Sequence, residues 1–494
     1  MNNWLKAAAL CAGALLLFLC GLFMGRGLEK RDAARALAAE TGALPTGETA
    51  PFSGAVPLIP GTEPEMLSPA YWTRGEDRLL FSAEEIVAFN ENNPPFVSFR
   101  SPRDGLEHFL FFYDLPETIS GEDLHTLMEQ ALPADFFEKR AVYMNGSPLT
   151  PAYREALEAA RDLEGIPETV QPRYALCVRR TQAMLLPAAD FAAPTAEERY
   201  CNELVSAELL PFTGAVLLHE SRDGAWGYAL CGSFCGWLPM EDLALCPDRE
   251  SWLEALRPQA FLVVTGSEIV LEQTAEPGCH GGEVLPMGTR LALIEDRPAQ
   301  IDGREGLGSW AVRLPCRAAD GSLAWEQALI PVSRDVHEGW LPMSSHAVIR
   351  QGFKFLGRVY GWGGSLDSND CSGMIRQIYG CFGLELPRNA LAIAKLQDLG
   401  CLACRHMSRD KKLDLLARIP AGNLLYMDGH LMLYLGMDGG KPYVLSSCAT
   451  YREPAGGAPE IRGGYCVFVS GLDLLRSSGK TWLEDLSFLQ WRDF

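Results

Sequence analysis

The sequence predicts a multidomain α+β protein, and three observations support that fold class. A chain of 494 residues is too long to fold around a single hydrophobic core. Two stretches of short alternating strands each end in the pentapeptide GWLPM, at 236–240 and at 339–343. After residue 346 the pattern changes to amphipathic helices and then to strands. We therefore expect helical domains and antiparallel strand domains in series.

The composition is that of a folded acidic protein. Hydrophobic residues make up 48% of the chain and charged residues 21%, which is ordinary for globular domains. The formal net charge is −20, and no run of Lys and Arg exceeds two residues. A nucleic-acid partner requires clustered basic side chains, because binding is driven by counterion release. We therefore expect no nucleic-acid partner.

The first residues predict export. Residues 7–25 are uncharged and apolar, and at about 1.5 Å per residue they just span the hydrocarbon core of a membrane. We expect 1–28 to be a signal peptide or membrane anchor, and 29–60, rich in Ala, Gly, Thr and Pro, to be a flexible linker. The predicted location is the periplasm or cell envelope, with membrane association through residues 7–25.

Residues 61–165 predict a helical region. The segment FSAEEIVAFNENNP carries Ser82 and, three residues later, Glu85, which is the pattern of a capping box. A second capped amphipathic helix follows in LTPAYREALEAARDLEGIP, and we expect it to end at Gly165. This region carries no catalytic motif, so we expect it to stabilise the other domains.

Two regions of short strands follow, at 166–250 and 255–346. In the first, a polar turn at Asp223 and Gly224 leads to a tryptophan-bearing strand, and GWLPM comes next. The second region closes with the same five residues. The repeat predicts tandem modules of one type, each a small barrel of hairpins.

Fifteen cysteines are scattered along the chain. The CxxC pair Cys401 and Cys404 has only His406 nearby, whereas a zinc site needs a further ligand pair at suitable spacing. We expect this pair to be structural thiols or a disulfide-prone turn, and we expect no metal or organic cofactor. Because the total is odd, at least one thiol stays unpaired within the chain, as a nucleophile requires.

One cysteine, Cys371, lies at a position that favours a nucleophile. Cys371 begins an amphipathic segment whose apolar residues share one helical face, and Gly383 marks the end of that helix. Free backbone N–H groups and the helix dipole stabilise an anion at this position, so we expect a lowered thiol pKa and a nucleophile. A helix-start thiol that only packs is the alternative, and position alone leaves both open.

A cysteine nucleophile needs a base, and two histidines are available after it. His406 lies in a polar, basic loop, whereas His430 follows an Asp-Gly turn and opens the apolar strand LMLYLG. A cysteine on a helix and a histidine on a strand have the working geometry of papain-like enzymes. On the next predicted strand, Ser446 or Ser447 is the candidate to orient the base.

Together these pieces resemble a known family. The stretch YGWGGSLDSNDCSGMIRQIYGCFGLELPRN, followed by DGHLMLYLG, is similar to the NlpC-type cell-wall cysteine peptidases, whose fold is papain-like. The resemblance implies a catalytic domain at 347–494 with two bacterial SH3-like domains before it. It also implies the subgroup that hydrolyses γ-D-glutamyl–diamino acid bonds, with peptidoglycan stem peptides or murein fragments as substrates.

The resemblance assigns the catalytic roles. Cys371 matches the nucleophile and His430 the general base. Tyr360 matches the tyrosine that supports the oxyanion beside the Cys371 backbone N–H. Ser446 stands where the family usually has a histidine or another polar residue, so a hydroxyl would orient His430 here.

The resemblance also assigns substrate contacts. Asp370 and Ser372 match the pair that binds the free α-amine of the substrate's L-Ala. Trp362 matches the loop packed behind the nucleophile, where a tight turn is an equally compatible role. Tyr200, in the segment 190–205, matches a loop that reaches the substrate cleft, although packing on its own domain explains it as well.

Departures from the family pattern leave two other functions open. After LPR the chain reads Asn389-Ala-Leu-Ala, where the family tends to run through Ser and Gln. Together with Ser446 this allows a non-catalytic scaffold that binds the cell wall. An amidase or acyltransferase that uses the same Cys–His pair on another acyl group is the remaining alternative.

Overall fold

The computed structural model describes residues 56–275, 278, 280–453 and 460–492. The predicted signal peptide or anchor lies outside the described residues, as does most of the predicted linker. Within the described part of the chain, no helix is long and apolar enough to cross a membrane. Residues 58–494 form one compact unit, and only that unit is described below.

The first region, up to residue 165, mixes helices with short strands. The Ser82 capping box is confirmed, since its hydroxyl accepts the Glu85 N–H and the Glu85 carboxylate accepts the Ser82 N–H. The second predicted helix ends at Ala160 rather than at Gly165, and a 3-10 turn follows it. The elements are η1 (Pro64–Leu67), α2 (Pro69–Trp72), β1 (Leu79–Phe81), α3 (Ala83–Asn92), β2 (Phe96–Arg100), β3 (Glu107–Phe111), β4 (Ile119–Ser120), α4 (Gly121–Ala131), η2 (Phe136–Arg140), β5 (Tyr143–Met144), β6 (Ser147–Pro148), α5 (Pro151–Ala160) and η3 (Leu163–Gly165).

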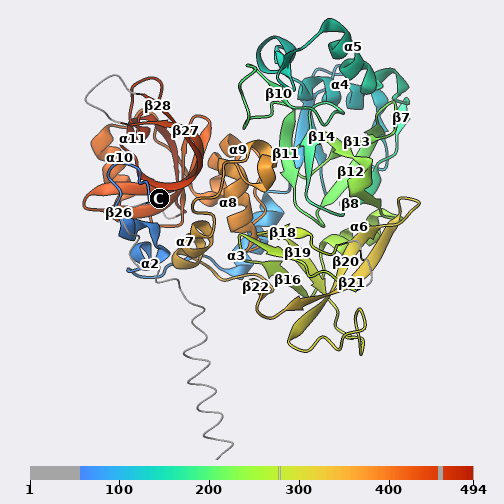
Figure 1. The fold of residues 1–494 in the computed structure, drawn as a ribbon. Coiled ribbons are helices and arrows are strands. Elements are labelled where there is room, and N and C mark those ends of the chain that lie inside the picture. The colour runs from blue at the N-terminus through green and yellow to red at the C-terminus, as the bar shows by residue number, and fades with distance from the viewer. Residues whose placement is uncertain (1–55, 276–277, 279, 454–459, 493–494) are drawn as a thin grey trace, which may run out of the picture. The chain divides into compact units, whose positions relative to one another are not determined.

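The first strand region forms a seven-stranded antiparallel sheet in the order β11-β9-β14-β13-β12-β8-β15 (Figure 1). Its inner face shares one hydrophobic core with the preceding helical region, and Trp252 is fully buried in that core. The elements are β7 (Thr169–Val170), β8 (Arg173–Cys177), β9 (Thr181–Met184), β10 (Ala192–Ala193), β11 (Val205–Leu209), β12 (Gly214–Glu220), β13 (Trp226–Leu230), β14 (Cys235–Pro239), η4 (Met240–Asp242), β15 (Leu243–Leu245) and α6 (Arg249–Leu256).

The second strand region forms a five-stranded antiparallel sheet in the order β21-β20-β19-β16-β22, with a separate β17–β18 pair. Its core is its own, built around Leu262, Leu291 and Val312. The elements are β16 (Phe261–Val264), β17 (Glu268–Val270), β18 (Val284–Pro286), β19 (Arg290–Leu293), β20 (Ser309–Arg317), β21 (Leu323–Pro331), β22 (Val336–Glu338) and β23 (Met343–Ser344). Neither sheet closes on itself within the described residues, so the two predicted barrels are open sheets here.

The two GWLPM copies adopt different structures. The first lies almost entirely in β14, where Trp237 is 1% exposed in the sheet core. The second lies in a turn after β22, with Gly339 at φ 68° and Trp340 36% exposed. The pentapeptide therefore does not mark one structural element repeated twice.

The C-terminal region carries a six-stranded antiparallel sheet in the order β24-β29-β25-β26-β27-β28, drawn in orange to red in Figure 1. Alternate residues of β26 enter two cores, because successive side chains of a strand point to opposite faces. Leu431 and Leu433 pack in the core of α8, whereas Met432 and Tyr434 pack with Trp482. The elements are α7 (Ser345–Phe353), η5 (Trp362–Asp367), α8 (Cys371–Gly380), α9 (Ala390–Ala394), η6 (Gln397–Leu399), β24 (Cys401–Ala403), α10 (Arg409–Leu416), β25 (Leu424–Met427), β26 (His430–Asp438), β27 (Lys441–Arg452), β28 (Ile461–Gly471), α11 (Trp482–Asp485) and β29 (Leu486–Gln490).

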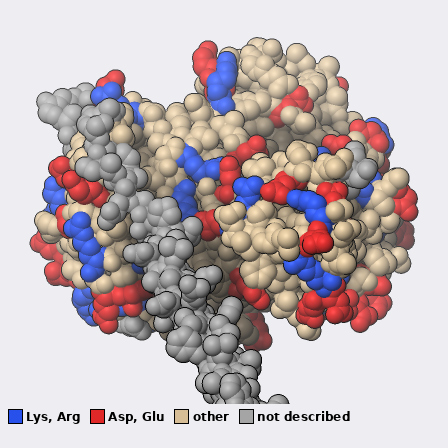
Figure 2. All heavy atoms as spheres, turned by 60° about the horizontal axis from the view of Figure 1, so that its bottom comes forward, with Lys and Arg blue, Asp and Glu red and all other residues tan. Residues whose placement is uncertain are grey.

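The surface reflects the acidic composition. On the face drawn in Figure 2, Lys and Arg side chains lie in small groups next to Asp and Glu side chains, and no continuous basic surface is visible there. This face therefore lacks the clustered positive charge that a polyanion would need.

Candidate active site

Cys371 is the first residue of α8, as the sequence predicts. Asp370 caps the helix, since its Oδ1 accepts the Gly373 N–H at 2.7 Å. Cys371 is 8% exposed, and the backbone N–H of Leu431 acts on its thiol to lower the pKa. Leu431 directly follows His430 in β26, so the start of the helix and the start of the strand meet at the thiol.

The acidity of Cys371 differs from the prediction. Burial, the largest effect, and the neighbouring Asp370 carboxylate raise the pKa of the thiol to about 11. The Leu431 N–H, the Arg388 guanidinium and the Ser372 N–H act in the opposite direction but do not offset burial. The predicted lowering of the pKa is therefore wrong for the protein without substrate, because a buried thiolate loses its contact with water.

His430 is buried and contacts Ser446. Its Nε2 lies 3.2 Å from the Ser446 Oγ, and its ring packs edge-on against Trp482 with 5.4 Å between the ring centroids. Burial, and secondarily the charge of Arg476, lower the pKa of His430 to about 3. The structure thus brings Ser446 to Nε2 of the predicted base.

Thiol and imidazole are both neutral at rest. Among the described residues no hydrogen bond joins the Cys371 thiol to the His430 ring; the thiol meets the strand through the Leu431 N–H instead. Catalytic hydrogen bonds often tighten only in the substrate complex, so this arrangement fits a resting enzyme.

The Asp370 carboxylate is surrounded by donors. It forms an ion pair with Arg388, accepts the Gly363 N–H at 3.1 Å and the Ser372 hydroxyl at 3.1 Å, and caps α8 through Gly373. Burial by itself raises the pKa of Asp370, but the Arg388 charge and these hydrogen bonds together hold the pKa below its ordinary value. Asp370 is therefore an ionised, fully bonded group.

These contacts bear on the predicted amine site. Arg388 also donates to the Ser372 Oγ at 2.7 Å, so one guanidinium holds both residues predicted to bind the substrate's α-amine. An ammonium group would have to share or replace Arg388 at Asp370. Amine binding by Asp370 and Ser372 stays a prediction, whereas the observed contacts are the helix cap formed by Asp370 and the bonds of both residues to Arg388.

The glycine turn before the nucleophile fits against β11. Gly363 and Gly364 have φ values of 62° and 96°, in the left-handed region that glycine tolerates. A Cβ on Gly363 would lie 2.5 Å from the Val205 side chain, and one on Gly364 would lie 2.2 Å from the Cβ of Glu208. The turn therefore needs glycine at both positions. Trp362 packs at the edge of the core shared by the helical and first strand regions.

Tyr360 and Tyr200 meet through a third tyrosine. Tyr360 is buried, and burial together with the charges of Asp370 and Cys371 raises the pKa of its phenol. Its backbone N–H donates to the Tyr465 carbonyl oxygen at 2.8 Å, and the Tyr200 ring stacks on Tyr465 with 4.0 Å between centroids. Tyr200 therefore reaches the segment beside Tyr360, and its contact there is packing on Tyr465.

A buried charged network was missed by the sequence analysis. Glu208 of β11 forms an ion pair with Arg180 and accepts from the Gln377 side chain at 2.6 Å, while Gln377 accepts from Asn369 at 3.2 Å. Arg180 also donates to the Ser368 carbonyl oxygen at 2.8 Å. The network joins the first strand region to the residues just before Cys371. Its only sequence signal is a polar glutamate within the apolar run of VSAELL.

Arg388 is the arginine of the LPR motif, and the sequence predicted no role for it. A cavity of about 930 Å³ lies beside it and beside α8, lined by residues that include Gln377, Glu208, Tyr113 and Trp340. Cys371 and His430 do not line this cavity. The thiol and the cavity are therefore separate features, connected through Arg388 and Gln377.

A family model matches part of the C-terminal region. Residues 357–447 match the family model described as the NlpC/P60 family, and these residues contain both Cys371 and His430. The search of curated proteins found no match.

One solved structure has the same fold over most of its length. A structure titled as a novel NlpC/P60 endopeptidase from Photobacterium damselae subsp. piscicida superposes with a TM-score of 0.67 at 14% identity, covering 88% of this chain and 98% of that chain. Two Trichomonas vaginalis proteins, NlpC2 and NlpC1, match at 11% and 12% identity with TM-scores of 0.22 and 0.24. They cover 61% and 65% of this chain and 96% and 93% of their own. The similarity to the first structure establishes the fold of most of the chain.

Proposed function

Residues 357–447 carry an NlpC/P60 domain, a family of generally cell-wall peptidases, and from this premise we propose that the protein is an exported cysteine peptidase of the cell wall. The bond is the γ-D-glutamyl–diamino acid bond of peptidoglycan stem peptides, or of murein fragments released from the wall. The observation that carries the proposal is the meeting of the first residue of α8, Cys371, with the first residues of β26, His430 and Leu431.

The reaction proceeds from the neutral pair. The Cys371 sulfur attacks the γ-glutamyl carbonyl carbon while its proton passes to Nδ1 of His430, because Nε2 is engaged by Ser446. The resulting oxyanion is stabilised by Tyr360 and by the Cys371 backbone N–H, which has no partner within the helix because it lies in the first turn.

Three proton transfers complete the turnover. His430 gives its proton to the leaving amine of the diamino acid, the C–N bond breaks and a thioester remains. His430 then takes a proton from the water that attacks the thioester carbonyl. When the C–S bond breaks, His430 returns this proton to the Cys371 sulfur, and the released γ-glutamyl acid loses its own proton to solvent. Ser446 acts on His430 as a positioning residue throughout.

The two strand regions have a supporting role in this proposal. We assign both sheets to SH3-like modules, as the resemblance implies, and Tyr200 to the edge of the substrate cleft. Residues 7–25 direct the chain across the membrane or hold it there.

Incubation with L-Ala-γ-D-Glu-diaminopimelate, followed by mass analysis, tests the activity. The wild-type protein should release the dipeptide L-Ala-γ-D-Glu and free diaminopimelate, and Cys371→Ala should release neither. Intact substrate with the wild-type protein, or full turnover by Cys371→Ala, would overturn the proposal.

A non-catalytic scaffold is the second candidate, and the buried neutral thiol favours it. Labelling with iodoacetamide over a range of pH separates the two functions when substrate or a peptide analogue is added. A catalytic Cys371 becomes more reactive near neutral pH when ligand is bound, because the proton moves to His430. A scaffold thiol keeps a pKa near 11 with or without ligand and still binds isolated murein.

A further inference from the structure

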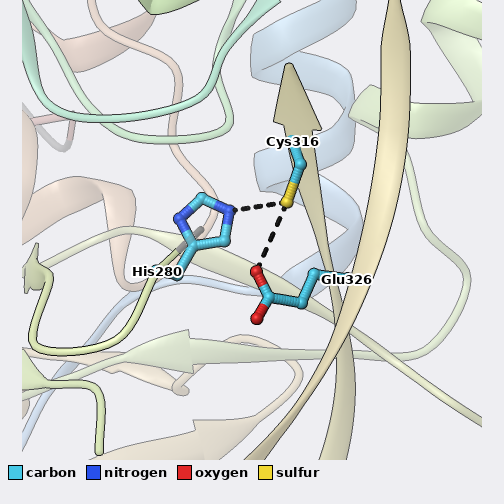
Figure 3. Close-up of side chains that lie close together, drawn as sticks. All are labelled: His280, Cys316 and Glu326. Atoms are coloured by element: carbon cyan, nitrogen blue, oxygen red, sulfur yellow. Dashed lines mark hydrogen bonds between the residues drawn. The ribbon is translucent and has the colours of Figure 1, made fainter. Parts of the chain in front are cut away.

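Three potential metal ligands converge in the second strand region (Figure 3). Cys316 lies on β20 opposite Ala324, and Glu326 lies on β21 opposite Leu314, so the two side chains share one face of the hairpin. His280, from the segment between β17 and β18, points to the same place. His280 and Cys316 are each 4% exposed.

The spacing of the ligand atoms is that of a tetrahedral site. The Cys316 Sγ lies 3.3 Å from the His280 Nε2 and 3.5 Å from the Glu326 Oε2, and all three atoms lie within 4.8 Å of one another. Zinc bonds of about 2.3 Å to sulfur and about 2.0–2.1 Å to nitrogen or oxygen, at a tetrahedral angle, place the ligand atoms roughly 3.3–3.6 Å apart. The two separations from the Cys316 sulfur therefore match the edges of a zinc tetrahedron.

The hydrogen bonds of His280 orient it as a ligand. Its Nδ1 contacts the Glu283 carboxylate, which only accepts hydrogen bonds when ionised, so the proton sits on Nδ1. The Nε2 lies 3.0 Å from the Pro315 carbonyl oxygen, to which it donates when it carries a proton, and 3.3 Å from the Cys316 sulfur. A metal ion bound at Nε2 takes the place of that proton.

The contact of His280 Nδ1 with the Glu283 carboxylate is typical of metal-bound histidines, which donate their other N–H to a carboxylate. The Oε1 of Glu283 is buried and, among the described residues, has no hydrogen-bond partner.

We propose that His280, Cys316 and Glu326 bind one divalent ion of the zinc class. One thiolate, one imidazole and one carboxylate suit zinc and exclude calcium or magnesium, which prefer oxygen ligands only. A water or the Pro315 carbonyl oxygen completes the four ligands. The ion has a structural role, because it ties the segment after β17 to the β20–β21 hairpin.

Metal analysis of the full chain in a Cys371→Ala background tests this site. That background removes zinc bound at the catalytic thiol. After treatment with chelator, incubation with zinc sulfate and gel filtration, we expect one zinc per chain by mass spectrometry of the metal, and a higher thermal midpoint than without zinc. Zinc at trace level in the reloaded protein would overturn the proposal.

Matched variants locate the ion. Cys316→Ala and the nearly isosteric Glu326→Gln should each lower the affinity for zinc by at least about 10-fold, since each removes a ligand. His337→Ala is the control, because His337 lies on β22 of the same sheet and, within the part of the chain that the structure describes, its ring bonds the Gly339 carbonyl oxygen at 3.1 Å and no metal ligand. Unchanged zinc content and affinity in the two ligand variants would assign the metal to another site, such as the CxxC pair, and reject this one.

The cobalt spectrum gives a readout that does not depend on variant folding. Cobalt in place of zinc should show a thiolate charge-transfer band with an intensity corresponding to one sulfur ligand. A spectrum without that band, in cobalt-loaded folded protein, would show that Cys316 is not a ligand.

Discussion

The two strand regions hold opposite ends of the nucleophile helix α8 by different means. The first region holds the Cys371 end through buried charges, with Glu208 of β11 bonded to Arg180 and Gln377. The second region holds the other end through backbone and apolar contacts. There the Cys381 carbonyl oxygen accepts the Leu341 N–H at 3.0 Å, and the Cys381 thiol donates to the Val264 carbonyl oxygen at 3.5 Å.

The two ends of α8 are held by different contacts because they have different functions. A buried ion pair is costly to desolvate, but its hydrogen bonds fix direction as well as distance. The residues before Cys371 set the position of the thiol, so directional contacts to Ser368 and Asn369 are placed there. The far end of α8 needs only to be held in place, and packing suffices.

The two GWLPM copies show the same contrast, and their tryptophans give the largest expected effect. Trp237→Ala should cost about 5 kcal/mol of unfolding free energy, because a fully buried indole leaves a cavity in the first sheet. Trp340→Ala should cost about 1 kcal/mol, because that side chain is one-third exposed and packs on Phe261 and Gly383. Urea denaturation of both variants measures the difference. Equal losses would mean that the two copies are equivalent after all.

Removing the buried carboxylate should have the next largest effect. Glu208→Ala leaves the Arg180 guanidinium buried without its partner and should cost about 4 kcal/mol of stability. We also expect kcat to fall more than KM rises, because the network positions the residues before the nucleophile. Chemical denaturation and steady-state kinetics measure the two effects.

The control for Glu208 lies on the same sheet. Glu220→Ala breaks an ion pair with Arg173 in which both side chains are more than one-third exposed, so its cost should stay below about 1 kcal/mol. If Glu220→Ala reduced turnover as much as Glu208→Ala, the effect would belong to the sheet as a whole and not to the buried network.

Much of the nucleophile end could be predicted from sequence, because its signals are local. A helix cap, a glycine turn and a histidine after an Asp-Gly turn are each contained in a few consecutive residues, so Cys371, the WGG turn and the Ser446 contact with His430 were placed correctly. The fold expected for the C-terminal region came from the resemblance of its motifs to a known family, because β26 is apolar on both faces and shows no alternation.

The rest depends on contacts between distant residues. Glu208 and Gln377 are 169 positions apart, and no local pattern indicates that a strand glutamate meets a helix glutamine. The thiol pKa was mispredicted for the same reason, since burial depends on the strands packed over Cys371. The GWLPM repeat misled because the neighbours of a tryptophan, more than its five-residue context, decide whether it is buried.

Acid should weaken the nucleophile end before the far end of α8. His430 has a pKa of about 3 in the fold and an ordinary value of 6.5, so below pH 6.5 the unfolded chain binds a proton that the native protein does not. Stability therefore falls as pH drops from 6.5 to 3, by about 2 kcal/mol at pH 5. Asp370, whose pKa is lowered, adds a loss of the same sign at lower pH.

Hydrogen exchange at pH 7 and pH 5 locates this loss. Protection should decrease first in β26 and in the residues around Cys371, and later at Cys381 and Leu341. His430→Gln should flatten the pH dependence of the urea midpoint between pH 6.5 and 5. An unchanged slope in that variant would assign the acid sensitivity to another group.

The smallest effect is expected at an ion pair of the second region that lies near Cys381, at the far end of α8. Lys354 donates to the Asp335 carboxylate at 2.7 Å and to the Thr265 carbonyl oxygen at 2.9 Å, but both charged side chains are about one-third exposed. Lys354→Met keeps most of the packing and should cost less than about 1 kcal/mol, with kcat unchanged. The loss should also shrink at high salt, because exposed charges are screened. A loss as large as that of Glu208→Ala, or a fall in kcat, would show that the second region also supports the active site through charge, and the contrast between the two ends of α8 would not hold.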